Sequence, residues 1–218
     1  MKPIFLSAPE MKPLLDSQSY FDCVSQTIAQ LPLMVIERVS EILLAAYEHR
    51  RTVFLFGNGG SAALASHFAC DLGKGTVNGS RKRFQVVALT DNVPIMTAWA
   101  NDSNYEDIFS EQLLNLARSQ DVAFAISGSG NSPNVLKALN TARQEKMFTI
   151  GLTGFVGGKM KELCDACIII PSDNMQVIED LHLCVAHSLF TSLRSKIAQH
   201  VSSDLRVPSA MFVRASAK

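Results

Sequence analysis

Apolar residues recur at helical spacing in the first part of the chain and gather into short, nearly continuous runs after residue 50. Between about residues 20 and 49 they lie three or four positions apart, which predicts helix. Pro32 interrupts this pattern, and because proline lacks an amide N–H it predicts two helices or one kinked helix. Residues 1–19 contain three prolines and little periodicity, which predicts an N-terminal arm.

Five short apolar runs predict strands, and stretches of helical periodicity lie between them. Strands are expected at 52–56, 84–89, 122–126, 148–152 and 167–170, and helices at 61–72, 95–100, about 104–118, 132–146, 156–163 and 176–199. Because the runs are apolar along their whole length, both faces of the sheet should be buried, as in parallel sheets. The sequence therefore predicts an α/β domain over residues 20–199, with a mostly parallel five-stranded sheet flanked by helices and an N-terminal helical segment. Residues 200–218 lose the periodicity and predict a C-terminal tail.

Two loops rich in glycine and serine follow two of the predicted strands. Residues 57–61 read GNGGS and residues 127–132 read SGSGNS, and a predicted helix follows each loop. A helix start offers free N–H groups to an anion, glycine lets the backbone approach it, and hydroxyl groups add donors. A single loop of this kind is also common for packing reasons. Two such loops at strand carboxyl ends, where ligands of parallel sheets bind, predict a phosphorylated small molecule as the ligand.

The composition of the chain limits which kinds of partner it is expected to bind. Lys+Arg and Asp+Glu both number 20, so no net charge attracts nucleic acid or a membrane surface. No apolar run approaches the roughly 20 residues that span a bilayer, and the first residues lack the apolar segment of a signal peptide. The five cysteines lie mostly in apolar runs, which favours reduced thiols in the cytoplasm. Cys164 and Cys167 have the spacing of redox or zinc sites but lack a second pair, so packing is the preferred interpretation.

Histidine and carboxylate pairs lie on two of the predicted helices. His67 and Asp71 are four residues apart, and Glu179 and His187 are eight apart, so each pair can share one side of its helix. Alone, each pair would more often be a surface pair. Near two phosphate loops, they predict an acid–base pair or a four-ligand metal site. His182 lies about 140° around the helix from His187 and is interpreted as a structural histidine with satisfied hydrogen bonds.

Asn101 and Asp102 are expected in a loop after a short apolar helix. Asparagine and aspartate favour helix caps, so capping is one interpretation of this dipeptide. Contact with sugar hydroxyl groups is the other.

Five motifs resemble one known family, in the same order and with similar spacing. They read GNGGSAALASHFACDLGKGT, ALTDNVPIMTAWANDSNYEDIFSEQL, AISGSGNSPNVLKALNTAR, LTGFVGGKM and VIEDLHLCVAH. The chain resembles the sugar isomerase (SIS) domain family over about residues 20–197, and within it most closely the phosphoheptose isomerases. The resemblance implies conversion of sedoheptulose 7-phosphate to D-glycero-D-manno-heptose 7-phosphate. It also implies a parallel sheet, a homotetramer in which the N-terminal helices pack together, and active sites at subunit interfaces.

The resemblance also implies roles for particular residues. The phosphate-binding serines correspond to Ser61, Ser127, Ser129 and Ser132, the sugar contacts to Asn58, Gly59 and Asp102, and the zinc-binding histidines to His67 and His187. Asp71 takes the place of a catalytic glutamate, and Glu179 that of a glutamine at the metal site. Gly128 replaces a threonine between two phosphate serines, and Lys74 is the candidate substitute for a missing arginine.

Three functions are consistent with these observations. The first is an aldose–ketose isomerase in which Asp71 or Glu179 acts as the base, His187 as its partner, and zinc polarises the substrate oxygens. The second is a non-catalytic SIS protein that binds a phosphosugar or a protein partner such as a replication initiator. The third is an isomerase of another ketose phosphate. Because both histidines and two carboxylates are present, the sequence favours an enzyme.

Overall fold

The computed structural model describes residues 16–77 and 82–204 of the chain. Most of the predicted arm and tail, residues 1–15 and 205–218, lies outside the described residues. The elements are, in chain order, α1 (Ser17–Ile28), α2 (Leu33–Glu48), β1 (Thr52–Gly57), α3 (Gly60–Cys70), the π-helical turn η1 (Asp71–Gly75), β2 (Gln85–Ala88), α4 (Val93–Asp102), the 3-10 turn η2 (Tyr105–Asp107), α5 (Ser110–Leu116), β3 (Val122–Ser127), α6 (Pro133–Gln144), β4 (Phe148–Thr153), the 3-10 turn η3 (Met160–Glu162), β5 (Ala166–Ile169) and α7 (Met175–Asp204).

The five strands form one sheet in the order β2-β1-β3-β4-β5, and every neighbouring pair is parallel. The predicted α/β class and the parallel five-stranded sheet are confirmed. The register places Leu55 of β1 beside Phe124 of β3, which in turn lies beside Ile150 of β4. The order brings β1 and β3, the two strands that precede the glycine and serine loops, next to each other at the centre of the sheet.

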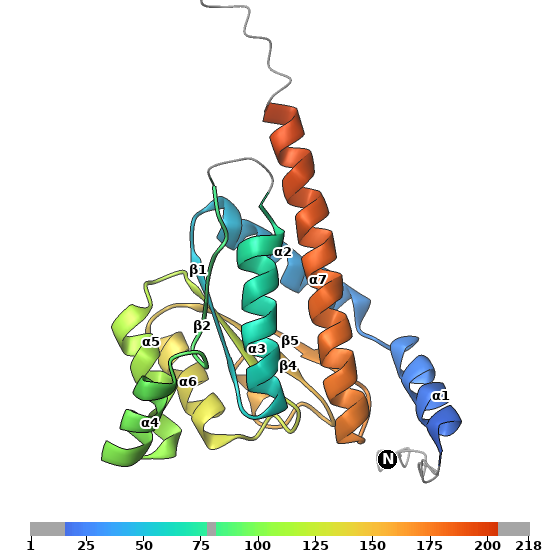
Figure 1. The fold of residues 1–218 in the computed structure, drawn as a ribbon, viewed down its shortest axis with the longest axis horizontal. Helices are drawn as coiled ribbons and strands as arrows, with labels where there is room; N and C mark the ends of the chain where they lie inside the picture. The colour runs from blue at the N-terminus through green and yellow to red at the C-terminus, as the bar shows by residue number, and fades with distance from the viewer. Residues whose placement is uncertain (1–15, 78–81, 205–218) are drawn as a thin grey trace, which may run out of the picture.

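Both faces of the sheet are covered by helices (Figure 1). On β3, Phe124 and Ile126 belong to an apolar cluster that includes side chains of α2, α3 and α7. Ala123 and Ala125 point the other way and pack with side chains of α5 and α6. Alternate residues of a strand face opposite sides, so a strand between two helical layers must be apolar throughout. The unbroken apolar runs in the sequence follow from this three-layer arrangement.

The N-terminal segment forms two helices, as the position of Pro32 predicts. Asp16 caps the first, where its side chain accepts a hydrogen bond from the amide of Ser19 at 2.7 Å. Tyr20 fastens α1 to α7, since its hydroxyl donates to the Asp180 carboxylate at 2.5 Å. This hydrogen bond is the main reason that the pKa of Tyr20 rises to about 12. The helix α7 runs beside α3 and extends past the body of the domain (Figure 1).

Three predictions of helix position differ from the structure. The expected helix over 156–163 is wrong, because Gly157 and Gly158 have φ of 89° and 55° and leave only the turn η3 helical. The expected helix over 104–118 is divided into η2 and α5. Asp102 is the last residue of α4, so it does not lie in a loop after that helix. Within the described ranges, no helix is both long and apolar enough to cross a membrane.

Candidate active site

The two glycine and serine loops meet because their strands are neighbours. β1 ends at Gly57 and β3 at Ser127, at the same edge of the sheet. Asn58 of the first loop and Asn134 of α6 exchange a reciprocal pair of amide hydrogen bonds, at 2.9 Å and 2.8 Å. The Tyr105 hydroxyl donates to Asn58 as well, at 3.2 Å. These contacts hold the first loop against the start of the helix that follows the second.

The starts of α3 and α6 both lie at this edge of the sheet. Gly59 precedes α3 with a φ of 56°, a conformation that favours glycine. Ser61, in the first turn of α3, is buried. Ser132 stands at the N-cap of α6, where it makes no capping bond within the described residues, and its hydroxyl lies 3.3 Å from that of Ser127. Hydroxyl and amide donors at two helix starts form an arrangement suited to a phosphate group.

The second loop is held in place by close backbone contacts. Gly130 has a φ of 63°, and a Cβ atom there would lie only 2.3 Å from the carbonyl oxygen of Gly157. Ser129 is half-buried, and its hydroxyl accepts a hydrogen bond from the amide of Asn131 at 3.2 Å. At Gly128 a Cβ atom would lie 2.5 Å from the sulfur of Met175. The side chain at the start of α7 therefore occupies the space that the family's threonine would need.

His67 and His187 bring α3 and α7 together at a second point. Their Nε2 atoms lie 2.9 Å apart, and the Asp71 Oδ2 lies 3.5 Å from the first and 3.7 Å from the second. Asp71 Oδ2 is buried and has no hydrogen-bond partner among the described residues. Of the residues described, these three form a group whose potential ligand atoms all lie within 4.8 Å of one another.

This group fits a tetrahedral metal ion. With Zn–N and Zn–O bonds near 2.0–2.2 Å, ligand atoms of a tetrahedral site are separated by about 3.3–3.5 Å. The three measured separations lie around that value. Two imidazoles and one carboxylate also match the donor set of catalytic zinc sites, which keep a fourth position for water or substrate. In the absence of a metal, one imidazole must donate and the other accept in the contact between His67 and His187.

The position of Asp71 depends on a feature that the sequence analysis missed. At Asp71 the helix α3 changes into the π-helical turn η1, and such turns are frequent at functional sites. Two glycines lie in the turn, and at Gly75 a Cβ atom would lie 2.5 Å from the ring of Phe190 on α7. The sequence signal was this glycine pair, at positions 73 and 75, directly after a histidine and carboxylate pair.

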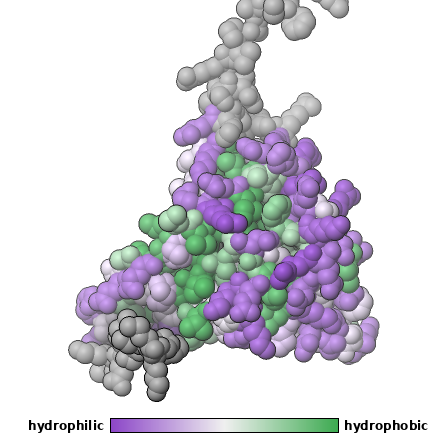
Figure 2. Space-filling model, turned by 180° about the vertical axis from the view of Figure 1, so that it is seen from behind, coloured by the Kyte–Doolittle hydropathy of each residue, from purple (hydrophilic) through white to green (hydrophobic). Residues whose placement is uncertain are grey.

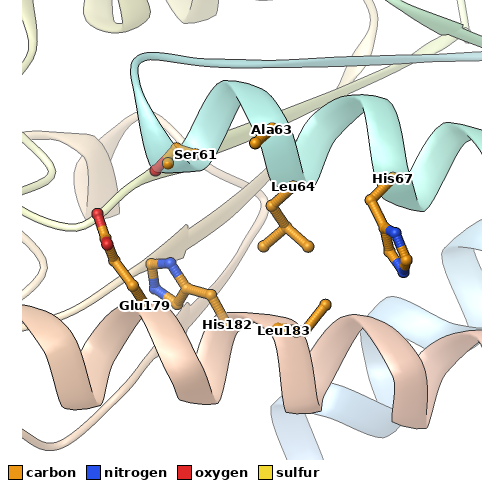
Figure 3. A pocket seen from close by; sticks show the side chains of 8 residues that line it. Ser61, Ala63, Leu64, His67, Glu179, His182 and Leu183 are labelled. Atoms are coloured by element: carbon orange, nitrogen blue, oxygen red, sulfur yellow. The ribbon is translucent and has the colours of Figure 1, made fainter.

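A pocket of about 330 Å³ lies between α3 and α7, at the lower end of the size range of small-molecule sites. Its polar side chains are those of Ser61, His67, Glu179 and His182, and Leu64 and Leu183 are among the apolar ones. Figure 3 shows Ser61 and Glu179 at one end and His67 at the other, with the leucines between. The pocket therefore runs from the first glycine and serine loop to His67.

Glu179 does not belong to the group of three ligand atoms. Its carboxylate lies beside Gly60, with Oε1 3.1 Å from the position that a Cβ atom would take there. Eight helical residues share a side of a helix but span about 12 Å along its axis. The spacing in the sequence places Glu179 and His187 on one side of α7, but the axial rise between them separates their side chains. The roles of Glu179 in catalysis and metal binding stay predictions.

His182 is not the satisfied structural histidine that the sequence predicted. It is 1% exposed, and its ring hydrogen-bonds the backbone of Thr153 at the end of β4. Its other nitrogen, Nε2, is buried and meets no partner in the described part of the chain. Burial lowers the pKa of His182 to about 4, so the ring is neutral at physiological pH. Asp102, by contrast, is exposed and accepts a hydrogen bond from Asn101 at 2.8 Å, and its contact with a sugar stays a prediction.

Comparisons with known proteins agree with this fold. Residues 19–154 match the family described as SIS domain. The phosphoheptose isomerase of Helicobacter hepaticus is 38% identical over 170 residues, which cover 78% of this chain and 86% of that protein. Phosphoheptose isomerase 1 of Campylobacter jejuni is 40% identical over 154 residues, or 71% and 82% of the two chains. The solved structure of phosphoheptose isomerase GmhA from Neisseria gonorrhoeae superposes with a TM-score of 0.76 at 29% identity, covering 82% and 96%.

The chain belongs to the SIS domain family. Within that family it belongs to the phosphoheptose isomerase branch.

Proposed function

We propose that this chain is an aldose–ketose isomerase that interconverts sedoheptulose 7-phosphate and D-glycero-D-manno-heptose 7-phosphate. The observation that carries the proposal is the convergence of Asp71 and His187 on His67, which lines one end of a pocket whose other end reaches the first glycine and serine loop at Ser61. Relatives named phosphoheptose isomerase, at 38–40% identity over most of their length, support the same substrate.

Ser61, Ser127, Ser129 and Ser132 are proposed to bind the phosphate group at the starts of α3 and α6. Charge-assisted hydrogen bonds from hydroxyl and amide groups would fix one end of the sugar. Asn58 is held by Asn134 at the same edge of the sheet and is proposed to contact the sugar. With the phosphate fixed there, the carbon chain lies along the pocket and its first two carbons approach the histidine group.

The reaction moves a proton between C1 and C2 through an enediol, which requires a base and a second group for the oxygen protons. Asp71 is the proposed base, because its carboxylate lies within the group and only Oδ2 faces the two imidazoles, which leaves Oδ1 for proton transfer. One carboxylate oxygen can face the imidazoles while the other takes the proton from one carbon and returns it to the next. His187 is proposed to transfer the proton between the two substrate oxygens through Nδ1, the ring nitrogen that does not face His67. Zinc held by His67, Asp71 and His187 would polarise those oxygens.

A coupled assay that detects the aldose product from sedoheptulose 7-phosphate tests the proposal. The protein should be freed of metal with a chelator and assayed before and after zinc is returned. We expect turnover that depends on zinc. Tight binding of the ketose phosphate without turnover by the zinc-loaded protein would instead favour the non-catalytic alternative.

We also propose that the chain assembles as a homotetramer through its N-terminal helices. Large apolar side chains stand exposed on α1 and α2, where Phe21 is 65% exposed, Leu33 68% and Met34 88%. Figure 2 shows apolar side chains gathered in a band across the face of the molecule that is seen from behind. Exposed apolar patches of this kind mark interaction surfaces. Light scattering should report a tetramer, and Met34→Glu should shift it to smaller species.

A further inference from the structure

The buried nitrogen of His182 has no function in the mechanism above. Position 182 lies in the apolar stripe of α7, between the fully buried Ile178, Leu181 and Val185. An apolar side chain at this position would avoid the cost of burying an unsatisfied polar atom. A histidine here therefore calls for a ligand that pairs with the free nitrogen.

The surroundings of His182 define what kind of group that ligand must offer. Nε2 makes no hydrogen bond in the described part of the chain, so the bond to the Thr153 backbone is made by Nδ1. This bond favours the protonated ring, so the backbone group is the carbonyl oxygen, which can only accept, and Nδ1 carries a proton. In a neutral ring, Nε2 then carries a lone pair and can only accept a hydrogen bond. The missing partner is therefore a donor.

The position of His182 indicates which donor. Its side chain lines the pocket that runs from Ser61 of the first loop to His67 (Figure 3). Ser61 and Glu179 are the nearest polar residues of that wall, and neither makes a hydrogen bond to Nε2. A sugar phosphate that spans the pocket carries hydroxyl groups along this stretch, and each hydroxyl is a donor.

We propose that His182 is a substrate-binding residue whose unprotonated Nε2 accepts a hydrogen bond from a sugar hydroxyl between the phosphate and the reacting carbons. This inference rests on the proposed function, since it requires a phosphosugar in the pocket. His182 is not part of the metal group, because its ligand atoms are not among those that lie within 4.8 Å of one another.

Two matched variants test the roles of the two ring nitrogens separately. In His182→Asn the amide nitrogen can replace Nδ1 and keep the bond to Thr153, but the acceptor at Nε2 is lost. In His182→Gln the amide oxygen can reach the place of Nε2 and supply an acceptor. We expect calorimetry with sedoheptulose 7-phosphate to show roughly three- to tenfold weaker binding for the first variant and binding within about twofold of wild type for the second. Affinity for inorganic phosphate, which has no sugar hydroxyl, should stay unchanged in both variants.

A measurement on the wild-type protein tests the proposal even if the variants do not fold. The ¹⁵N resonance of His182 Nε2 should report an unprotonated nitrogen in the free protein. It should move toward the hydrogen-bonded range when sedoheptulose 7-phosphate binds, but not when inorganic phosphate binds. An exposed histidine, His49 at the end of α2, serves as the internal control and should not respond to either ligand.

Each contrary result has a distinct meaning. Two results would overturn the role of His182 while leaving the proposed function intact. One is an Nε2 resonance that does not shift when sedoheptulose 7-phosphate binds, and the other is equal affinity of wild type and His182→Asn for this sugar phosphate. Loss of zinc from His182→Asn would overturn it as well, because His182 would then act on the metal. Failure of the wild-type protein to bind sedoheptulose 7-phosphate would overturn both proposals.

Discussion

The Nε2 atoms of His67 and His187 lie 2.9 Å apart although 120 residues separate them in the chain. Each ring stands on a long, well-packed helix, and Asp71 faces both rings from the buried side. The helices α3 and α7 thus meet at this contact. A metal ion placed between the rings would tie α3 to α7.

Removal of either imidazole should therefore remove the metal. We expect His67→Ala and His187→Ala each to lose zinc, as measured by mass spectrometry of the purified protein, and to lose about 10²–10⁴-fold in turnover. His49→Ala is the matched control, because His49 is exposed at the end of α2, and should keep both. Glu179→Gln should also keep zinc, since its carboxylate lies beside Gly60. Loss of zinc from that variant would show that Glu179 is a fourth ligand.

Asp71 should be needed for proton transfer beyond any contribution to metal binding. Asp71→Asn keeps the size of the side chain but removes its basicity, so we expect turnover to fall about 10²–10⁴-fold even in excess zinc. Binding of sedoheptulose 7-phosphate should change far less than turnover. Asp71→Glu, which restores the family's residue, should retain part of the activity. Wild-type turnover by the asparagine variant would remove Asp71 from the role of base.

A substitution of Ser132 should affect phosphate binding without affecting the stability of α6. Its hydroxyl makes no capping bond to α6 within the described residues, so Ser132→Ala should leave the melting temperature nearly unchanged. The same change removes a donor to a charged phosphate and should weaken sugar phosphate binding by about 1.5–3 kcal/mol. Ser195→Ala, on the exposed side of α7, is the control for both measurements. Unaltered affinity in Ser132→Ala would place the phosphate elsewhere.

His182 should make folding stability depend on pH. The ordinary pKa of a histidine side chain is 6.5, and that of His182 in the folded protein is about 4. As the pH falls, His182 is therefore protonated in the unfolded chain before it is protonated in the folded one. The free energy of unfolding therefore keeps its full value above about pH 6.5 and declines as the pH falls from 6.5 to 4. The total decline that is due to His182 is about 3 kcal/mol. Urea unfolding of wild type and His182→Gln at pH 7.5, 5.5 and 4.5 should show a smaller decline in the variant. Parallel declines would mean that His182 does not titrate in this way.

Much of the fold could be predicted from local patterns. The apolar runs predict the strands because a strand covered on both faces must be apolar at every position, whichever helices cover it. Pro32 separates α1 from α2 for a reason internal to the chain, its missing N–H. The two glycine and serine loops follow strands in the sequence, and in a parallel sheet all strand ends that lead into helices lie at the edge where ligands bind. These features depend on short segments alone.

The details of the site were decided by tertiary structure. The register of β1 beside β3 brings the loops together, and only the packing of α3 against α7 sets His67 against His187. Asp71 faces them from a π-helical turn whose Gly75 lies against the Phe190 ring on α7. Helical spacing assigns Glu179 and His187 to one side, yet they approach different parts of α3 because about 12 Å of helix lies between them. His182 gains its unpaired nitrogen because Thr153, 29 residues earlier in the chain, engages only one side of its ring. A sequence pattern fixes which way a side chain points from its own helix, whereas its partners depend on how distant elements pack.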